Sequence, residues 1–442
     1  MEVWALVMFA AAIPLLLLGY PVAFTLGAVS LLFGGVFLDM DFFDLLPMRI
    51  WGVMTNFTLL AVPLFIFMGI ILEKSGIAEE LLETMGLLFS RVRGGLAISI
   101  VLVGTLLAAT TGVVGATVVT MGVIALPVLL KHGYHAPLAT GTIAASGTLG
   151  QIVPPSIILI LLGDVIGVPV GQLFSAAITP ALILVGMFIL YIVIVAWFRP
   201  ETAPAIDRAL LSQEGSENIG WRIIQCMLPP LVLVSAVLGS IFFGIASPTE
   251  SAAVGALGAL LLAALRKRLT LSALQETTRK TTALTSMVFL ILIGATAFGL
   301  VFRGMGGDML LEEILTELPG GEWGFLAISM LLIFLLGFFL DFLEICFIVV
   351  PILAPIAAGM DINLLWFAVL IAMNLQTSFL TPPFGFSLFY LKAVAPKTVK
   401  ITQIYRGIIP FVVIQIIVLA LLMLFPELTL WLPEKLDELQ GL

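Results

Sequence analysis

Long apolar runs recur along the whole chain, and they constrain its fold more than any other feature. They follow one another from residue 3 to residue 425. Each holds about 20 residues, which is enough to cross a hydrocarbon core about 30 Å thick. Only 10% of the residues are charged and 61% are hydrophobic, whereas a soluble domain carries roughly 25% charged residues. The sequence therefore predicts an all-α, polytopic membrane protein without a large water-soluble domain.

Several other kinds of protein are disfavoured. The net charge of −8 comes without a basic stripe, which argues against nucleic-acid binding. The sequence has no Gly-x-x-x-x-Gly-Lys-Ser/Thr loop, so ATP-driven transport by this chain alone is not expected. Cys226 and Cys346 lie in apolar sequence and are expected to pack as small hydrophobes. His132 and His135 have no cysteine, aspartate or third histidine beside them, so no metal centre is expected there.

Apolar length and loop punctuation predict about ten spanning helices and two re-entrant hairpins. Two apolar stretches, 94–130 and 324–359, are too long for one span and are expected to be the hairpins. Segments 73–93 and 303–322 are expected to be amphipathic helices at the two interfaces. The spans are expected at about 3–18, 21–38, 51–72, 137–163, 176–198, 223–243, 247–265, 281–302, 363–391 and 407–425.

In this predicted topology, most lysine and arginine residues lie on one side of the membrane. Of the 19 basic residues, all except Arg49, Arg303 and Lys435 fall on one side of the predicted membrane. Those three are set among aspartates and glutamates. The basic side is expected to be cytoplasmic, since short cytoplasmic loops carry an excess of lysine and arginine. Both termini are then expected on the opposite, non-cytoplasmic side.

The second half of the chain repeats the first at low identity. Each half carries five spans, and an odd number inverts the second half relative to the first, as in many secondary transporters. The expected domains are a first inverted repeat at 1–198, a cytoplasmic linker at 199–222 and a second inverted repeat at 223–442. Leu96–Ser99 recurs as Leu326–Ser329. Pro127, Pro154 and Pro155 recur as Pro355, Pro382 and Pro383, and these three prolines share one constant offset.

The two hairpin tips carry polar residues inside apolar sequence. The first tip, Thr110–Thr117, has two glycines that permit a chain reversal and three hydroxyls that can satisfy freed backbone groups. Close helix packing through small residues is the alternative. The second tip contains Asp341 and Glu344, and carboxylates at membrane depth are rare and usually functional. Asp341 could bind a cation, take a proton or pair with a basic group, or it could simply cap a helix at the tip.

Proline pairs interrupt two of the predicted spans. Ser146–Ser156 contains Pro154 and Pro155, and Asn374–Gly385 contains Pro382 and Pro383. Proline has no N–H and clashes with the preceding turn, so a pair at mid-span forces the helix to unwind. The freed carbonyls can line a cavity and coordinate a cation. A single proline is usually only a kink, but two such breaks at equivalent repeat positions favour contact with an ion or a substrate.

At these residues the sequence resembles the large membrane subunit of tripartite ATP-independent periplasmic (TRAP) transporters. The resemblance covers nearly the whole chain and is carried by Thr111–Thr117, Ala144–Ser156, Pro248–Gly255 and Thr381–Gly385. It implies sodium-driven secondary uptake of a small organic acid, with sodium as the coupling ion and no other cofactor. It implies an elevator fold, in which two hairpins and two broken helices move against a scaffold. It also implies two partners, a smaller four-helix membrane subunit and a periplasmic substrate-binding protein.

The resemblance also implies which residues bind sodium and substrate. One ion belongs to the first tip with the first break, the other to the second tip with the second break, and the substrate lies between them. The sodium-binding residues implied are Thr110, Thr111, Gly112, Gly115, Thr117, Ser146, Gly147, Thr148, Gly150, Pro154, Asp341, Asn374, Thr377, Ser378, Thr381 and Pro382. The substrate-binding residues implied are Gln151, Ser156, Glu344, Gln376 and Gly385.

Two further readings bear on the function. The run Asp341–Ile345 departs from typical dicarboxylate and sialic acid members, and looks more like a subgroup linked to 2-oxo acids and other organic acids. A stand-alone sodium/carboxylate symporter, which needs neither partner, remains the alternative. An intramembrane enzyme is disfavoured, because it needs a paired catalytic set such as serine with histidine or lysine, or two aspartates at membrane depth. The two histidines lie in a predicted loop, and no second intramembrane aspartate matches Asp341.

Overall fold

A computed structural model describes residues 1–89, 91–112, 114–205, 219–382 and 385–440. All regular secondary structure in these ranges is helical. The helices are α1 Glu2–Leu17, α2 Val22–Phe37, α3 Leu45–Met54, α4 Ala61–Lys74, α5 Ile77–Phe89, α6 Gly95–Thr111, α7 Val114–Lys131, α8 Ala136–Thr148, α9 Ile157–Ile166, α10 Val170–Phe198, α12 Ile219–Phe242, α13 Pro248–Leu265, α14 Leu271–Gly304, α15 Gly307–Thr316, α16 Glu322–Leu336, α17 Phe342–Glu344, α18 Val350–Gly359, α19 Leu364–Leu380, α20 Phe386–Val394, α21 Ile401–Leu424 and α22 Glu427–Gln440. Short helical turns are η1 Met40–Asp44, η2 Thr58–Leu60, η3 Leu149–Gln151, η4 Pro200–Thr202 and η5 Ile345–Val349.

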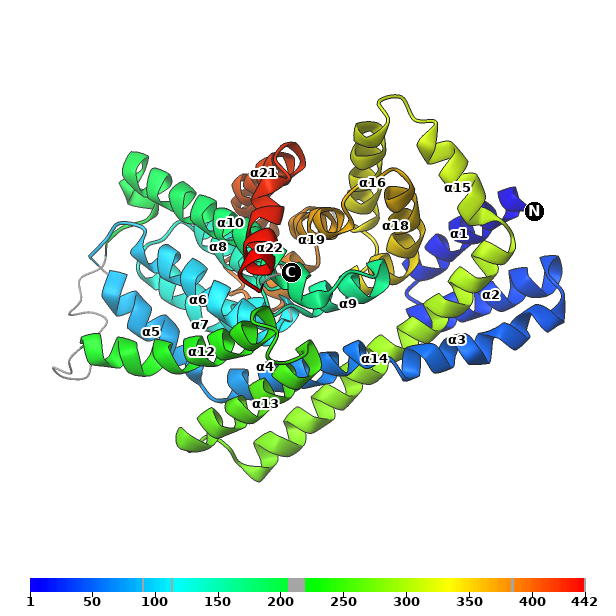
Figure 1. Ribbon diagram of the computed structural model, residues 1–442. Coiled ribbons are helices and arrows are strands. Elements are labelled where there is room, and N and C mark those ends of the chain that lie inside the picture. Colours follow the sequence, from blue (N-terminus) through cyan, green and yellow to red (C-terminus); the bar gives the residue numbers. More distant parts are fainter. Residues whose placement is uncertain (90, 113, 206–218, 383–384, 441–442) are drawn as a thin grey trace.

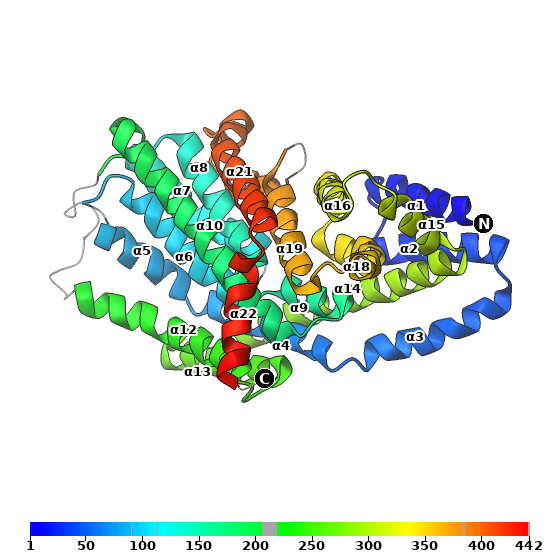
Figure 2. The same ribbon diagram turned by 45° about the horizontal axis from the view of Figure 1, so that its top comes forward.

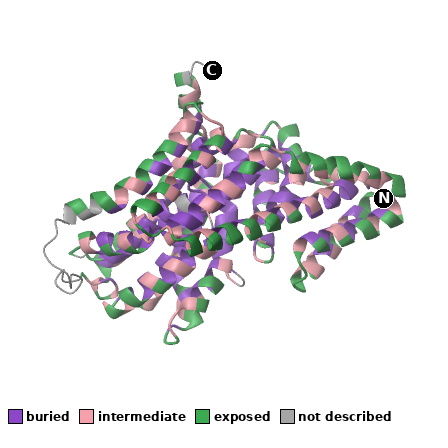
Figure 3. Cartoon of the chain, turned by 90° about the horizontal axis from the view of Figure 1, so that it is seen from below, coloured by how far each residue is buried: buried purple, intermediate pink, exposed green. Residues whose placement is uncertain are grey.

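The molecule is elongated, and its two ends are built from different helices. α1, α2, α3 and α15 lie at one end, and α5 with the start of α12 lies at the other (Figures 1 and 2). The long helix α14 connects the middle of the molecule to the first end (Figure 1). Buried residues concentrate towards the middle (Figure 3), where 138–163 and 366–380 are buried without interruption. The deepest parts of the molecule are therefore α8, α9 and α19.

Seven of the described helical segments are long and apolar enough to cross a membrane, or eight if the bent pair Met40–Met54 and Thr58–Lys74 is one span. The sequence predicted about ten. Five predicted spans are missing from the seven, because α1 and α2 stop at 16 residues, the span 51–72 is bent, and the two spans with proline pairs divide into shorter helices. Two of the seven segments, Val114–Lys131 and Phe342–Gly359, lie instead in the predicted hairpins. The chain is thus an all-helical, multi-pass membrane protein.

The structure corrects two of the predicted spans and adds one helix. The span 51–72 is not one helix, because the chain bends by 53° between α3 and α4, where the backbone N–H of Thr58 donates to Oδ1 of Asn56 at 2.9 Å. The span 281–302 is part of a longer helix, α14, which starts where the Thr270 hydroxyl caps the N–H of Ala273. Helix α22 was not predicted, since its charged sequence lacks an apolar run.

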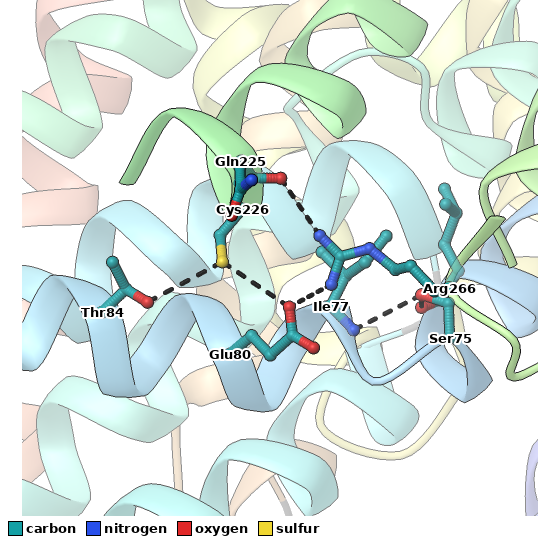
Figure 4. A network of polar contacts seen from close by, with 8 residues as sticks. Ser75, Ile77, Glu80, Thr84, Gln225, Cys226 and Arg266 are labelled. Carbon is teal, nitrogen blue, oxygen red and sulfur yellow. Dashed lines mark hydrogen bonds and ion pairs between the residues drawn. The ribbon is translucent and has the colours of Figure 1, made fainter. Parts of the chain in front are cut away.

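Helix α5 is amphipathic, as expected for its segment, and it is tied to the second half of the chain (Figure 4). Its apolar side chains, including Leu81 and Met85, are buried. On its polar side Glu80 forms an ion pair with Arg266, which follows α13. Arg266 also donates from Nη2 to the carbonyl of Gln225 at 3.2 Å, and the Cys226 thiol donates to Glu80 at 3.6 Å. These contacts hold α5 against α12 and α13.

Helices α8 and α21 pack with their backbones in direct contact. A Cβ atom on Gly141 would lie 2.1 Å from the carbonyl oxygen of Gly407, and a Cβ on Gly407 would lie 2.0 Å from the carbonyl oxygen of Pro137. Only glycine fits at either position, as at many close helix crossings in membranes. The start of α8 is thereby fixed on α21.

Candidate functional site

Two helices are interrupted in the middle of the molecule. Helix α8 ends at Thr148, passes through the turn η3, and reaches extended backbone at Ser156 before α9 begins. Helix α19 ends at Leu380, Thr381 is extended, and α20 begins after Gly385. Pro383 lies outside the described residues. The interruptions fall at the two proline pairs, where the missing N–H groups prevent a continuous helix. The two segments also meet, because α19 packs against both η3 and α9.

The first predicted tip meets the first interruption. Gly112 ends α6 in the left-handed conformation, with φ of 60°, which glycine adopts without steric cost. A Cβ on Gly112 would lie 3.3 Å from Cγ1 of Ile157, the first residue of α9. The side chains of Thr110 and Thr111 lie outside the described part of the structure. Thr117 of α7 is buried.

Glycines allow close packing around this tip. A Cβ on Gly147 would lie 2.2 Å from Cγ2 of Val118, so α8 and α7 are in tight contact. A Cβ on Gly150 would lie 3.6 Å from Ala108 of α6, which is ordinary contact. Gly147 on α8 and Gly150 in η3 are therefore brought close to α7 and α6.

The second predicted tip meets the second interruption. A Cβ on Gly337, at the end of α16, would lie 2.2 Å from Oγ of Ser378 in α19. Asn374 of α19 donates from Nδ2 to the carbonyl of Met330 in α16 at 2.6 Å. The ring centroids of Phe342 and Phe379 are 6.3 Å apart. The predicted residues Asn374, Ser378 and Asp341 therefore belong to one packed region.

Each tip also packs on the interrupted helix of the other half. Helix α7 contacts α20, and a Cβ on Gly115 would lie 3.1 Å from the ring of Tyr390. In the same way α9 contacts η5 and α18, and Figure 1 shows α9 passing beside α18 and α19. The two tips and the two interrupted helices thus pack together as one group. Tyr390 was not predicted, since nothing in its local sequence distinguishes it from other aromatic residues in apolar runs.

Asp341 and Glu344 form a helix cap at the second tip. Oδ1 of Asp341 accepts from the N–H of Phe342 at 2.7 Å, and Oε2 of Glu344 accepts from the N–H of Asp341 at 2.9 Å. The capping role considered for Asp341 is therefore present. Glu344 is buried and Asp341 half-buried, and neither forms an ion pair with any described residue. A buried carboxyl group without a counter-charge is stabilised by taking up a proton or by binding a cation, so the pair is suited to either role.

Most of the predicted hydroxyls donate to carbonyls of their own segment. The acceptors lie 2.6 to 2.9 Å away. A hydroxyl that donates its hydrogen keeps its lone pairs for another donor or a cation. The donors are Ser146, Thr148, Ser156, Thr377, Ser378 and Thr381, and their acceptors are Thr142, Ala145, Gln151, Met373, Leu375 and Thr377.

Gln151 and Gln376 stand at the two interruptions with unused side chains. Gln151 lies in η3 and Gln376 in α19, and both are fully buried. Neither the oxygen nor the nitrogen of either amide has a hydrogen-bond partner among the described residues. Leaving such a group unpaired costs about 1–3 kcal/mol. Two unpaired amides on adjoining segments are therefore suited to a polar ligand held between them.

Asp164 is a further acidic residue of this region that was not predicted. It lies near the end of α9, half-buried, and accepts from Nδ2 of Asn56 at 2.6 Å. The predicted span ended at residue 163, one residue before Asp164. A carboxylate directly beside a predicted boundary was the available signal. No group of three or more histidine, cysteine or acidic side chains suited to a metal occurs in the described ranges.

Membrane-length helices that surround two interrupted helices and buried, unpaired amides define a membrane transport protein. Residues 7–428 match the family model of the tripartite ATP-independent periplasmic transporter, DctM component. The chain belongs to this family. It is therefore a transporter subunit and not an enzyme, and it is one component of a transporter with several parts.

Individual relatives agree over the full length. The chain is 32% identical to the sialic acid TRAP transporter large permease protein SiaM of Vibrio cholerae, over 95% of this chain and 96% of that protein. It is 28% identical to the C4-dicarboxylate TRAP transporter large permease protein DctM of Rhodobacter capsulatus, over 98% and 99%. Its fold is similar to that of the YdaH transporter of Alcanivorax borkumensis, with a TM-score of 0.66 and 15% identity over 96% of this chain and 99% of that one.

Proposed function

We propose that this chain is the large permease of a sodium-driven secondary transporter that takes up a small organic acid across the bacterial inner membrane. The observation that carries the proposal is the pair of buried, unpaired amides of Gln151 and Gln376. Buried polar groups in proteins are nearly always paired, so an unpaired group needs an explanation. Relatives are named for sialic acid and C4-dicarboxylates, which are carboxylates, and a 2-oxo acid fits the same chemistry.

The substrate carboxylate is proposed to bind between the two interruptions. The amide nitrogens of Gln151 and Gln376 donate to it, with Ser156, Glu344 and Gly385 around it. The N-termini of α9 and α20 begin at the interruptions, and a helix N-terminus favours an anion.

Two sodium clusters are proposed beside the substrate. The first joins the Thr110–Thr117 tip to Ser146, Thr148 and the break at Pro154. The second joins Asp341 to Asn374, Thr377, Ser378, Thr381 and Pro382. Their support is the set of hydroxyl lone pairs and the uncompensated carboxylates of Asp341 and Glu344. A co-bound cation offsets the charge of an organic acid in a water-poor site, which couples the two.

Transport itself is proposed to follow an elevator scheme. Residues 1–198 and 223–442 act as inverted repeats, and the tips with the interrupted helices move as one body against a scaffold. The tight contacts of Gly147 with Val118 and of Gly337 with Ser378 support a single rigid body. A small four-helix membrane subunit and a periplasmic binding protein complete the transporter, with both termini of this chain in the periplasm.

Uptake into liposomes tests the proposal. The chain, its small subunit and its binding protein are reconstituted, and uptake of labelled 2-oxo acids and C4-dicarboxylates is measured with and without an inward sodium gradient. The Gln151→Met and Gln376→Met variants are measured beside the unsubstituted protein. We expect sodium-dependent uptake that also requires the binding protein, and its loss in both variants.

The outcomes separate the alternatives. Uptake that needs sodium but not the binding protein would identify a stand-alone symporter. Uptake of the same acids without any sodium dependence would exclude the sodium clusters. Unchanged substrate affinity in both glutamine variants would exclude the proposed substrate site, while leaving the family membership untouched.

A further inference from the structure

A cavity of about 410 Å³ lies where three helices end, outside the interrupted segments. It is bounded by the start of α8, the end of α10 and the start of α21. Arg199, Arg406 and His135 are among its lining residues. Its volume falls within the range of about 300–1,000 Å³ that is typical of small-molecule sites. The proposed transport site uses none of these residues.

Within the described ranges, no carboxylate pairs with either arginine at this cavity. Arg199 and Arg406 are exposed, and in the described part of the chain neither guanidinium has a carboxylate or a side-chain hydrogen-bond partner. Arg266, by comparison, is paired with Glu80. Two guanidinium groups at one concave site attract an anion, and phosphate is a preferred partner of arginine.

The polar wall of the cavity is held in place by its own hydrogen bonds. Thr202 donates from its N–H and its hydroxyl to the carbonyl of Arg199, at 2.9 and 2.8 Å. The N–H of His135 donates to the carbonyl of Thr202 at 3.0 Å. Oε1 of Gln403 accepts from the N–H of Lys400 at 2.9 Å, which leaves the Gln403 NH₂ as a donor. The N-termini of α8 and α21 add to the positive potential.

One side of the cavity is apolar and exposed. Ile194 and Phe198 line it with exposed fractions of 46% and 78%. Leu190 continues this exposed stripe one turn along α10, and Val413 lies on α21 two turns beyond Arg406. Arg199 directly follows the membrane-length helix α10, so the charges sit where an apolar span ends. A free anion gains nothing from such a stripe, whereas an acyl chain does.

We propose that this cavity binds the phosphodiester headgroup of an anionic phospholipid, between Arg199 and Arg406, with the acyl chains along α10 and α21. The headgroup contacts the ends of all three helices. It thereby stabilises the packing of α21 on α8, at the glycine contact of Gly141 with Gly407. Free phosphate has the same charged group as the lipid headgroup, but it has no acyl chains to contact Ile194 and Phe198.

Native mass spectrometry tests this without any transport assay. The full chain is purified in mixed micelles of phosphatidylcholine and phosphatidylglycerol, and retained lipids are counted after partial delipidation. The variants are Arg199→Gln, Arg406→Gln and the double variant, with Arg279→Gln as a matched control. Arg279 is an exposed arginine of α14 that is outside this cavity. We expect retention of phosphatidylglycerol to fall roughly fivefold for each cavity arginine and to be unchanged in the control.

Two results would overturn the proposal. The first is equal retention of phosphatidylglycerol by the unsubstituted protein and the double variant. The second is thermal stabilisation of lipid-free protein by inorganic phosphate alone that equals the effect of phosphatidylglycerol, which would assign the cavity to a free anion. Arg199→Lys and Arg406→Lys keep the charge and should retain most of the lipid. Matching unfolding temperatures in zwitterionic detergent show that the variants are folded.

Discussion

Nδ2 of Asn56 donates to Oδ1 of Asp164 at 2.6 Å, which joins the bend between α3 and α4 to the helix that follows the first interruption. The same amide accepts from the N–H of Thr58 through Oδ1, so both ends of the Asn56 side chain are used. Because Asp164 is half-buried and forms no ion pair with a described residue, this hydrogen bond is important for keeping its carboxylate at that depth.

Asn56→Ala should destabilise the protein by about 1–3 kcal/mol, because it leaves Asp164 without its donor. Thermal unfolding in detergent measures the change. A double-mutant cycle with Asp164→Ala isolates the interaction, since the double variant should lose less than the sum of the two single variants. Strictly additive losses would show that the two side chains do not interact.

Gln151→Met and Gln376→Met should leave unfolding stability unchanged or raise it by about 1–3 kcal/mol, while substrate affinity falls. Methionine has a similar shape and removes a buried, unpaired amide, which relieves its desolvation cost. Unfolding midpoints and binding of the labelled acid are measured on the same preparations.

Gln415 provides the matched control for the two glutamines. It lies in α21, outside both interrupted helices, and its buried amide is likewise unpaired among the described residues. Gln415→Met should give the same gain in stability without a change in substrate affinity. Loss of affinity in this variant as well would mean that a general packing effect, and not ligand contact, explains the losses at Gln151 and Gln376.

Asp341→Asn should raise the sodium concentration needed for half-maximal uptake by roughly tenfold or more, since a lost charge-assisted contact is worth about 1.5–3 kcal/mol. Asparagine caps helices as well as aspartate does, so this variant keeps the cap and removes the charge. Asp341→Ala removes both and should also lose about 1 kcal/mol of stability. An unchanged sodium dependence in Asp341→Asn would restrict this residue to its capping role.

Gly147→Ala should destabilise the protein by about 1–3 kcal/mol and reduce transport, because the new methyl group would overlap the Val118 side chain and push α7 away from α8. Gly186→Ala is the control, since a Cβ there meets no atom within 4 Å and alanine favours a helix. Equal stability of the two variants would contradict the close packing of α7 on α8.

The sequence predicted the interrupted helices well because the cause is local. A proline pair removes two N–H groups wherever the surrounding residues lie, so Pro154 and Pro382 revealed the breaks without any tertiary information. The apolar runs likewise revealed most of the helices. The bend at Asn56 was missed, because no proline or glycine occurs there and its causes are an asparagine turn and a partner on α9.

Contacts between distant parts of the chain were beyond prediction. Tyr390 lies against Gly115, and the two are far apart in sequence. Asp164 was not predicted either, because it directly follows the predicted span and its partner Asn56 is far away in the sequence. The unpaired state of Gln151 and Gln376 is also a property of packing, since it depends on every neighbour that fails to reach them.

The packing of each tip on the opposite interrupted helix has a consequence for the assembly of the protein in the cell. During synthesis the first tip and α9 enter the membrane before α18 and α20 have been made. Polar residues such as Gln151 and Thr117 are therefore in the bilayer before the helices of the second half can pack against their segments. In the proposed site, neither half supplies all of the residues. A chain cut in the linker 199–222 should consequently regain function only when both fragments are made in the same cell.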